Sequence, residues 1–103
     1  MQFRNPVIWR IMMSKIKINH NPDEKLINEL GIRSWSIWEK EVSEFPWTYD
    51  EKETCLLLEG EVKVTPDDGE PVEFAKGDLV EFPAGMSCTW KIIKAVKKHY
   101  NFG

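Results

Sequence analysis

The chain has few cysteines, no long apolar run and no strong excess of charge of one sign. Two cysteines, Cys55 and Cys88, are too few for the disulfide framework of a small secreted domain, so we expect free thiols in a reducing cytoplasm. The longest apolar run covers residues 55–58, so we expect neither a membrane span nor a secretory signal. A net charge of −3 is too mild to indicate a nucleic-acid partner.

What the chain does contain points to one small domain rich in aromatic rings. Its 103 residues suit a single core, since a chain of this size buries only roughly 60–70% of its unfolded surface. Aromatic residues make up 12%, five of them Trp, and such rings must either fill a core or line a hollow. Residues 91–103 carry four lysines and no acid, a pattern more typical of a solvated face or protected sheet edge than of a binding patch.

One short helix is predicted after residue 20. Asn21 can cap its first turn, Pro22 suits the first helical position, and two acids follow where the helix dipole favours negative charge. Leu26, Ile27 and Leu30 fall on one face, and Gly31 can end the helix.

The domain boundaries follow from this helix. We expect residues 1–20 to be an N-terminal extension, packed loosely or as an added edge strand, and residues 21–103 to form one domain. Residues 1–13 hold two arginines and no acid, which leaves two interpretations open, a remnant of a targeting segment and an upstream extension.

Beyond the helix the pattern changes to short strands separated by turn signals. Asp67-Asp68-Gly69 is a hairpin signal between apolar runs, and the final run is long enough for two strands joined near Lys94. Strand-forming residues gather in residues 35–42, 53–65, 72–74, 79–82 and 88–102. Many short strands with almost no helix indicate an antiparallel sandwich or a closed barrel.

Two spaced patterns narrow this choice. Glu53 stands seven residues before Gly60, and the segment from Gly77 to Cys88 has the form Gly-x5-Pro-x-Gly-x2-Cys. Together they resemble the two signature motifs of the cupins, over roughly residues 35–102. The resemblance implies an all-β fold, an antiparallel double-stranded β-helix (a cupin jelly-roll barrel), with one short N-terminal helix. Further matches resemble the small cupins related to ureidoglycine aminohydrolases and ethanolamine-utilisation cupins: residues 38–40, 45–47, 53–55, 58–60, 82–85 and 88–90.

The chain departs from the cupin pattern at the metal ligands. By the motif, Trp47, Tyr49 and Cys88 stand where the family has histidines, and Glu53 alone keeps its usual residue type. An indole nitrogen has no lone pair to offer, and a phenol must lose a proton with a pKa of about 10 to become a good ligand. We therefore expect no resident metal. If a transition metal does bind, its ligands are expected to be Glu53, Cys55 and Cys88, with His99 as a further candidate.

The same residues support a pocket without a metal. Partial desolvation of Glu53 favours its protonated form, the condition for a general acid or base near neutral pH, and the alternative is a carboxylate tied structurally to Tyr49 or to the backbone. Cys55 and Cys88 are more typical of inert buried thiols than of nucleophiles. The aromatic residues Trp47, Tyr49 and Trp90 can either box a ligand or fill the barrel.

Three functional hypotheses remain. The first is a module, or a metal-free enzyme, that binds a small polar metabolite around Glu53, as metal-free sugar-nucleotide epimerases of the superfamily do. The second is a metal-dependent, aminohydrolase-like enzyme with an altered ligand set, and the third is a structural cupin with a filled barrel. Trp35, Trp38 and Phe45 are expected in the outer layer or at the contact of a homodimer rather than in the pocket.

Overall fold

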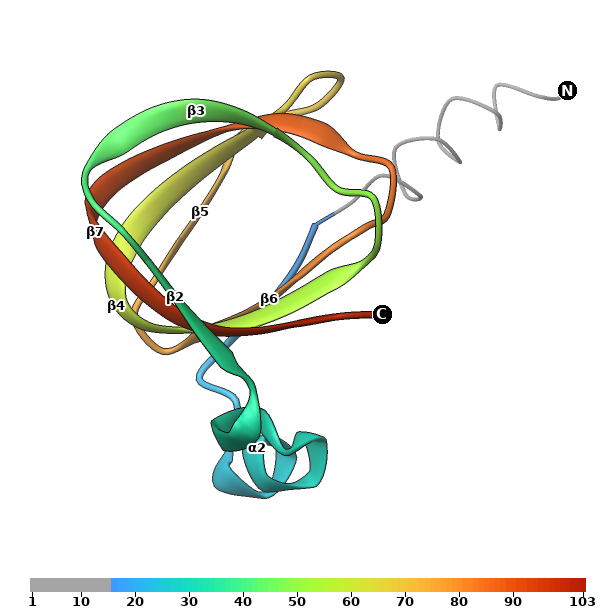
Figure 1. Cartoon of the computed structure of the whole chain (residues 1–103), viewed down its shortest axis with the longest axis vertical. Coiled ribbons are helices and arrows are strands. Elements are labelled where there is room, and N and C mark those ends of the chain that lie inside the picture. Colours follow the sequence, from blue (N-terminus) through green and yellow to red (C-terminus); the bar gives the residue numbers. More distant parts are fainter. Residues whose placement is uncertain (1–15) are drawn as a thin grey trace, which may run out of the picture.

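Antiparallel strands wrap around a common interior in the computed structural model, which describes residues 16–103 (Figure 1). Residues 1–13, for which the sequence leaves two interpretations open, lie outside the described residues. The described elements are β1 (Lys17–His20), α2 (Glu24–Leu30), the 3-10 helix η1 (Ile32–Ser34), β2 (Ser36–Lys40), β3 (Ser43–Thr48), β4 (Glu53–Pro66), β5 (Val72–Ala75), β6 (Asp78–Phe82) and β7 (Ser87–Phe102).

Two long strands, β4 and β7, form the spine of the fold. They pair along almost their whole length, from Glu53 opposite Phe102 to Pro66 opposite Cys88. Each also pairs with two short strands: β4 with β6 and then β5, and β7 with β3 and then β2. The sheet order is β1-β6-β4-β7-β2, and every pairing is antiparallel. Figure 1 shows this ribbon closing into a ring, which confirms the predicted all-β jelly-roll class.

Changes of register between Leu57 and Val62, on both sides of Gly60, allow the long ribbon to bend. Before them Glu53, Cys55 and Leu57 are buried, and after them burial switches parity and continues at Val62 and Val64. A mismatch of one residue between two paired strands reverses which side chains face the interior, because side chains alternate along a strand. Opposite this irregularity β7 continues without a break, so the prediction of two strands joined near Lys94 is wrong.

The helix lies outside the ring of strands (Figure 1). Its N-cap is Asp23, whose side chain accepts a hydrogen bond from the Leu26 N–H, rather than the expected Asn21. Gly31 ends the helix in the left-handed region, with φ of 67°, as predicted. Ile27 and the following η1 pack on the outer face of the barrel, against Leu56 and Leu79. None of the helices described in residues 16–103 has both the length and the apolar character needed to cross a membrane.

β1 pairs with β6 at one edge of the sheet. The hairpin predicted at Asp67–Gly69 joins β4 to β5, with Val64 opposite Val72. The interior between the strands holds four almost fully buried aromatic rings, Tyr49, Phe74, Phe82 and Trp90, packed among aliphatic side chains.

The packing at Gly60 can be tested by substitution. A Cβ there would lie 2.6 Å from the carbonyl oxygen of Ala95, whereas at Gly77, which also has positive φ, it would meet nothing within 4 Å. We expect Gly77→Ala to lower the free energy of unfolding by about 1 kcal/mol from backbone strain alone, and Gly60→Ala by about 3 kcal/mol or more. Urea denaturation measures both, and equal losses would contradict this description of the bend.

Candidate functional site

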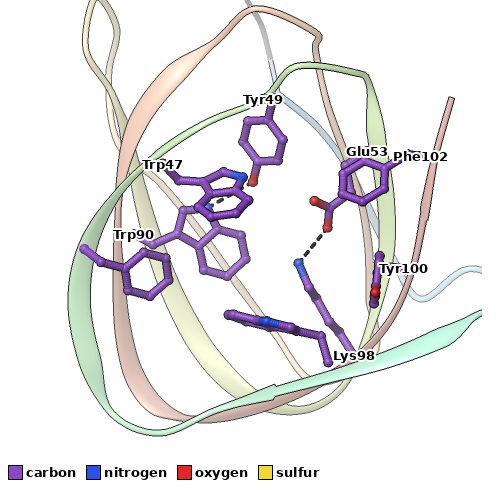
Figure 2. A pocket seen from close by; sticks show the side chains of 9 residues that line it. Trp47, Tyr49, Glu53, Trp90, Lys98, Tyr100 and Phe102 are labelled. Carbon is purple, nitrogen blue, oxygen red and sulfur yellow. Dashed lines mark hydrogen bonds and ion pairs between the residues drawn. The ribbon is translucent and has the colours of Figure 1, made fainter.

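One end of the barrel contains a hollow of about 270 Å³ with walls made largely of aromatic rings (Figure 2). β2 and β3 supply one wall and the C-terminal half of β7 supplies another, while Tyr49 follows β3 directly. The lining residues are Trp38, Phe45, Trp47, Tyr49, Glu53, Trp90, Lys98, Tyr100 and Phe102. Only two of these nine carry a formal charge, so any polar recognition in the hollow depends mainly on that pair.

Those two charges form an ion pair. Lys98 Nζ donates to Glu53 Oε2 over 2.6 Å, and the two side chains are only 7% and 4% exposed. They come from neighbouring strands, and Figure 2 shows them meeting across the hollow. Placing two ions in an apolar interior costs several kcal/mol each, on the order of what their close contact returns, so each ion depends on the other.

Aromatic rings surround the ammonium on the side away from the carboxylate. Lys98 Nζ lies 4.8 Å from the ring centroids of both Trp38 and Trp90, and 5.9 Å from that of Tyr100. The faces of these rings attract a cation, and more strongly where water is excluded. Phe45 stacks on Trp90 with an interplanar angle of 14°, which fixes the second ring in place. The position of the ammonium is therefore set from several directions.

Tyr49 presents a neutral hydroxyl to the same hollow. Its oxygen accepts a hydrogen bond from Trp90 Nε1–H over 3.0 Å, and its ring stacks on Phe82 with centroids 4.8 Å apart. Burial, reinforced by the negative charge of Glu53, raises the pKa of Tyr49 far above its ordinary value. The phenol thus keeps its proton and can donate it in a hydrogen bond.

The mouth of the hollow is bordered by two rings in contact with solvent. Trp47 is 47% exposed and Phe102 is 45% exposed. A second, more open hollow of about 200 Å³ shares Trp47, Tyr49 and Phe102 with the first and is also bordered by Asp50 and Glu51. A ligand entering the barrel would pass these rings first.

The structure brings together four of the six residues proposed from the sequence for the pocket, Trp47, Tyr49, Glu53 and Trp90. It does not place the two cysteines there. Cys55 lies in the core, where burial raises its thiol pKa to about 12. Cys88 donates to the carbonyl oxygen of Trp47 over 3.6 Å, and burial, with the charge of Asp67, raises its pKa to about 11. Both thiols are free and have little thiolate near neutral pH.

His99, the further candidate ligand, also lies away from the hollow. Its Nδ1 is 3.0 Å from the carbonyl oxygen of Trp35, on the opposite side of β7 from Lys98. This position follows from strand alternation, because adjacent residues of a strand point to opposite faces.

Two expectations need correction. Trp38 and Phe45, expected in the outer layer or at a dimer contact, line the hollow, so a homodimer gains no support from them and stays a prediction.

The second correction concerns Lys98, which was expected among the solvated lysines of residues 91–103 and is buried. The alternation of side chains along β7 would have placed it correctly. Lys98 is an even number of residues from the inward-facing Trp90 and Val96, so it points to the same face of the strand, and it stands opposite Trp38 of β2.

The donor set does not fit the metal of a typical cupin. Among residues 16–103, no three His, Cys, Asp or Glu side chains are grouped as a metal ion would need. Glu53 is the only one of the four motif positions with the residue type of a cupin ligand. Its carboxylate is already bonded to an ammonium, and a second cation there would meet the charge of Lys98.

Comparison with known proteins shows which family the chain is similar to. A model of the EutQ-like cupin domain matches residues 27–100. The solved structure of a DUF861 family protein from Thermotoga maritima shares 50% sequence identity with this chain, with a TM-score of 0.84, and the match covers 86% of this chain and 100% of that one. No match was found among curated proteins.

Two ethanolamine-utilisation proteins are more distant. A putative ethanolamine utilization protein Q from Salmonella typhimurium is 30% identical, and the EutQ protein of Clostridium difficile is 22% identical, each with a TM-score of 0.57. Both matches cover 62% of this chain, and this chain spans about half the length of each of those proteins (51% and 50%). The second likeness supports the fold alone.

A double-mutant cycle measures the coupling inside the pair. We expect Lys98→Met and Glu53→Gln each to lower the free energy of unfolding by about 3–5 kcal/mol, because each leaves its partner buried without a counter-charge. The double variant should recover about 2 kcal/mol of the summed loss. The exposed pair Lys94–Glu61, with 3.8 Å between charged atoms on the same two strands, serves as the control and should show coupling of about 0.5 kcal/mol or less. Equal coupling in the two cycles would contradict the structure.

Proposed function

Since the chain belongs to the family of EutQ-like cupin domains, we propose that its barrel binds a small polar metabolite without the help of a resident transition metal. The observation that carries the proposal is the Glu53–Lys98 pair, a buried donor and acceptor bordering a hollow whose other walls are largely rings. Small-molecule sites have this character, apolar walls with a few convergent polar groups.

The size of the hollow supports a small ligand. Its volume of about 270 Å³ is close to the lower end of small-molecule sites, roughly 300 Å³. A structural cupin with a filled barrel would have no such space. This observation favours a binding function over the purely structural one.

The polar groups define what the ligand would offer. Lys98 has three N–H donors, one of which bonds Glu53 among the described contacts, and Tyr49 contributes an O–H. The carboxylate of Glu53 has a second oxygen able to accept. A ligand that carries a carbonyl or hydroxyl oxygen, with a flat or apolar part against Trp47 and Trp90, would satisfy these groups.

A cationic ligand is disfavoured. The place where an amine would lie, against a carboxylate and over aromatic faces, is held by the protein's own Lys98. The name of the Salmonella neighbour refers to ethanolamine, which is an amine, yet the charge pattern of this pocket supports a neutral or anionic ligand instead. The same ammonium is the reason why we propose that no metal cation is required.

A thermal-shift screen of neutral and anionic metabolites tests the proposal. A ligand present at a hundred times its Kd adds about 2.7 kcal/mol, which raises the Tm by roughly 10 °C in a domain of this size. Trp47→Ala removes one ring at the mouth and should weaken binding of any hit roughly tenfold. Val42→Ala, which trims another exposed apolar residue outside the lining set, should leave the Kd within about twofold. A screen without hits, or equal affinities for the two variants, would reject this pocket.

A further inference from the structure

Lys98 differs from the other lysines of β7 in its access to a proton acceptor. Lys94 is largely in solvent, and the carboxylate oxygen of its partner Glu61 lies 3.8 Å from its nitrogen. Lys98 is 5% exposed, borders the hollow, and has a carboxylate oxygen 2.6 Å from its nitrogen. The group that would remove its proton is thus in place before any ligand arrives.

The contact between Lys98 and Glu53 provides a path for a proton. The ammonium faces the rings of Trp38 and Trp90, and its nitrogen lies 2.6 Å from the carboxylate oxygen Oε2. Transfer of one proton along this hydrogen bond leaves an amine, whose nitrogen lone pair can attack a carbonyl carbon, beside a carboxylic acid.

We propose that Lys98 captures a small aldehyde or ketone as an imine, with Glu53 carrying the protons. This inference rests on the proposed function, because it needs the hollow to admit a ligand, and it specifies the ligand as a carbonyl compound. Buried lysines in apolar pockets are the usual residues for such covalent chemistry.

The step balances without any other reactant. Glu53 accepts a proton from the Lys98 ammonium, and the nitrogen lone pair attacks the carbonyl carbon to form the C–N bond. Glu53, now a carboxylic acid, gives its proton to the former carbonyl oxygen and takes a second proton from that nitrogen, which leaves a neutral carbinolamine. Glu53, again protonated, then protonates the hydroxyl, the C–O bond breaks and water leaves. Of the three protons on the starting ammonium, one stays on the iminium nitrogen and two leave in the water.

The surroundings suit the product as well as the reactant. The iminium carries the same positive charge as the ammonium, so Glu53 and the faces of Trp38 and Trp90 can stabilise both. Tyr49, held as a neutral phenol, provides an O–H on the same hollow for the ligand oxygen while the C–N bond forms. The net charge of the pair stays zero from the ammonium to the iminium, so the reaction leaves no ion unpaired in an apolar space.

Reductive trapping tests this inference on the whole protein. Glycolaldehyde, pyruvate and acetone serve as probes, each incubated with the protein and sodium cyanoborohydride at pH 7, followed by peptide mass spectrometry. With at least one probe we expect a single adduct on Lys98, formed at least tenfold faster than on Lys91, Lys94 or Lys97, which are internal controls. Adducts spread evenly over the lysines, or no Lys98 adduct with any probe, would overturn it.

Variants identify the role of the carboxylate. Glu53→Gln should slow trapping at Lys98 at least tenfold, because the amide cannot accept the proton. Glu61→Gln, which alters the exposed pair with Lys94 on the same strands, should leave the rate within twofold. Lys98→Arg keeps the charge but should give no adduct at this position. Equal rates in the two glutamine variants would reject Glu53 as the proton carrier.

The experiments distinguish a failure of the imine proposal from a failure of the proposed binding function. Ligands that stabilise the protein in the thermal-shift screen, together with no adduct on Lys98, would overturn the imine and leave the binding pocket standing. A screening hit that slows trapping at Lys98, while Lys94 reacts as before, would support both. The measurement on the unmodified protein needs no variant to fold.

Discussion

The contact between Glu53 and Lys98 is the constraint on which the interior of this barrel depends. A carboxylate and an ammonium, both almost without solvent, are tolerable only because they meet at 2.6 Å and because the ammonium also faces two indole rings. Together the charges sum to zero, so the remaining walls can be apolar. In this barrel the carboxylate of Glu53 is bonded to an ammonium that comes from the neighbouring strand.

The arrangement of the strands produces this contact. β7 runs unbroken from Ser87 to Phe102, which keeps Trp90 and Lys98 on the same side of the strand. The changes of register between Leu57 and Val62 bring the two parts of β4 to the interior with opposite parity, and Glu53 belongs to the first part. β2 then places Trp38 directly opposite Lys98. The same strand pairings thus build the barrel and bring Glu53, Lys98 and Trp38 together.

The sequence was sufficient for features that depend on local chemistry or on motif spacing. The hairpin at Asp67–Gly69, the helix stop at Gly31 and the barrel class follow from turn residues and from two spaced patterns. Motif spacing also indicated that Trp47, Tyr49 and Glu53 are close, and the structure has all three around one hollow.

Lys98 and Trp38 could not be placed in the same way. A lysine is solvated in most proteins, and its burial here depends on a carboxylate 45 residues away in the chain. Trp38 faces the interior because β2 pairs with the far half of β7, a non-local choice that no short pattern encodes. The two cysteines illustrate the converse: the motif position of Cys88 and the spacing of Cys55 from Glu53 suggested the pocket, whereas the packing of the strands directs both thiols into the core.

The most direct test of the proposal that the Glu53–Lys98 pair leaves no need for a resident metal is the metal content of the protein itself. Tag-free protein, incubated with Mn, Fe, Ni and Zn salts and then dialysed, should retain below about one tenth of an equivalent of any of these metals by elemental analysis. Retention of about one equivalent that disappears in Glu53→Gln would contradict the account, because the carboxylate would then hold a metal cation in place of the Lys98 ammonium.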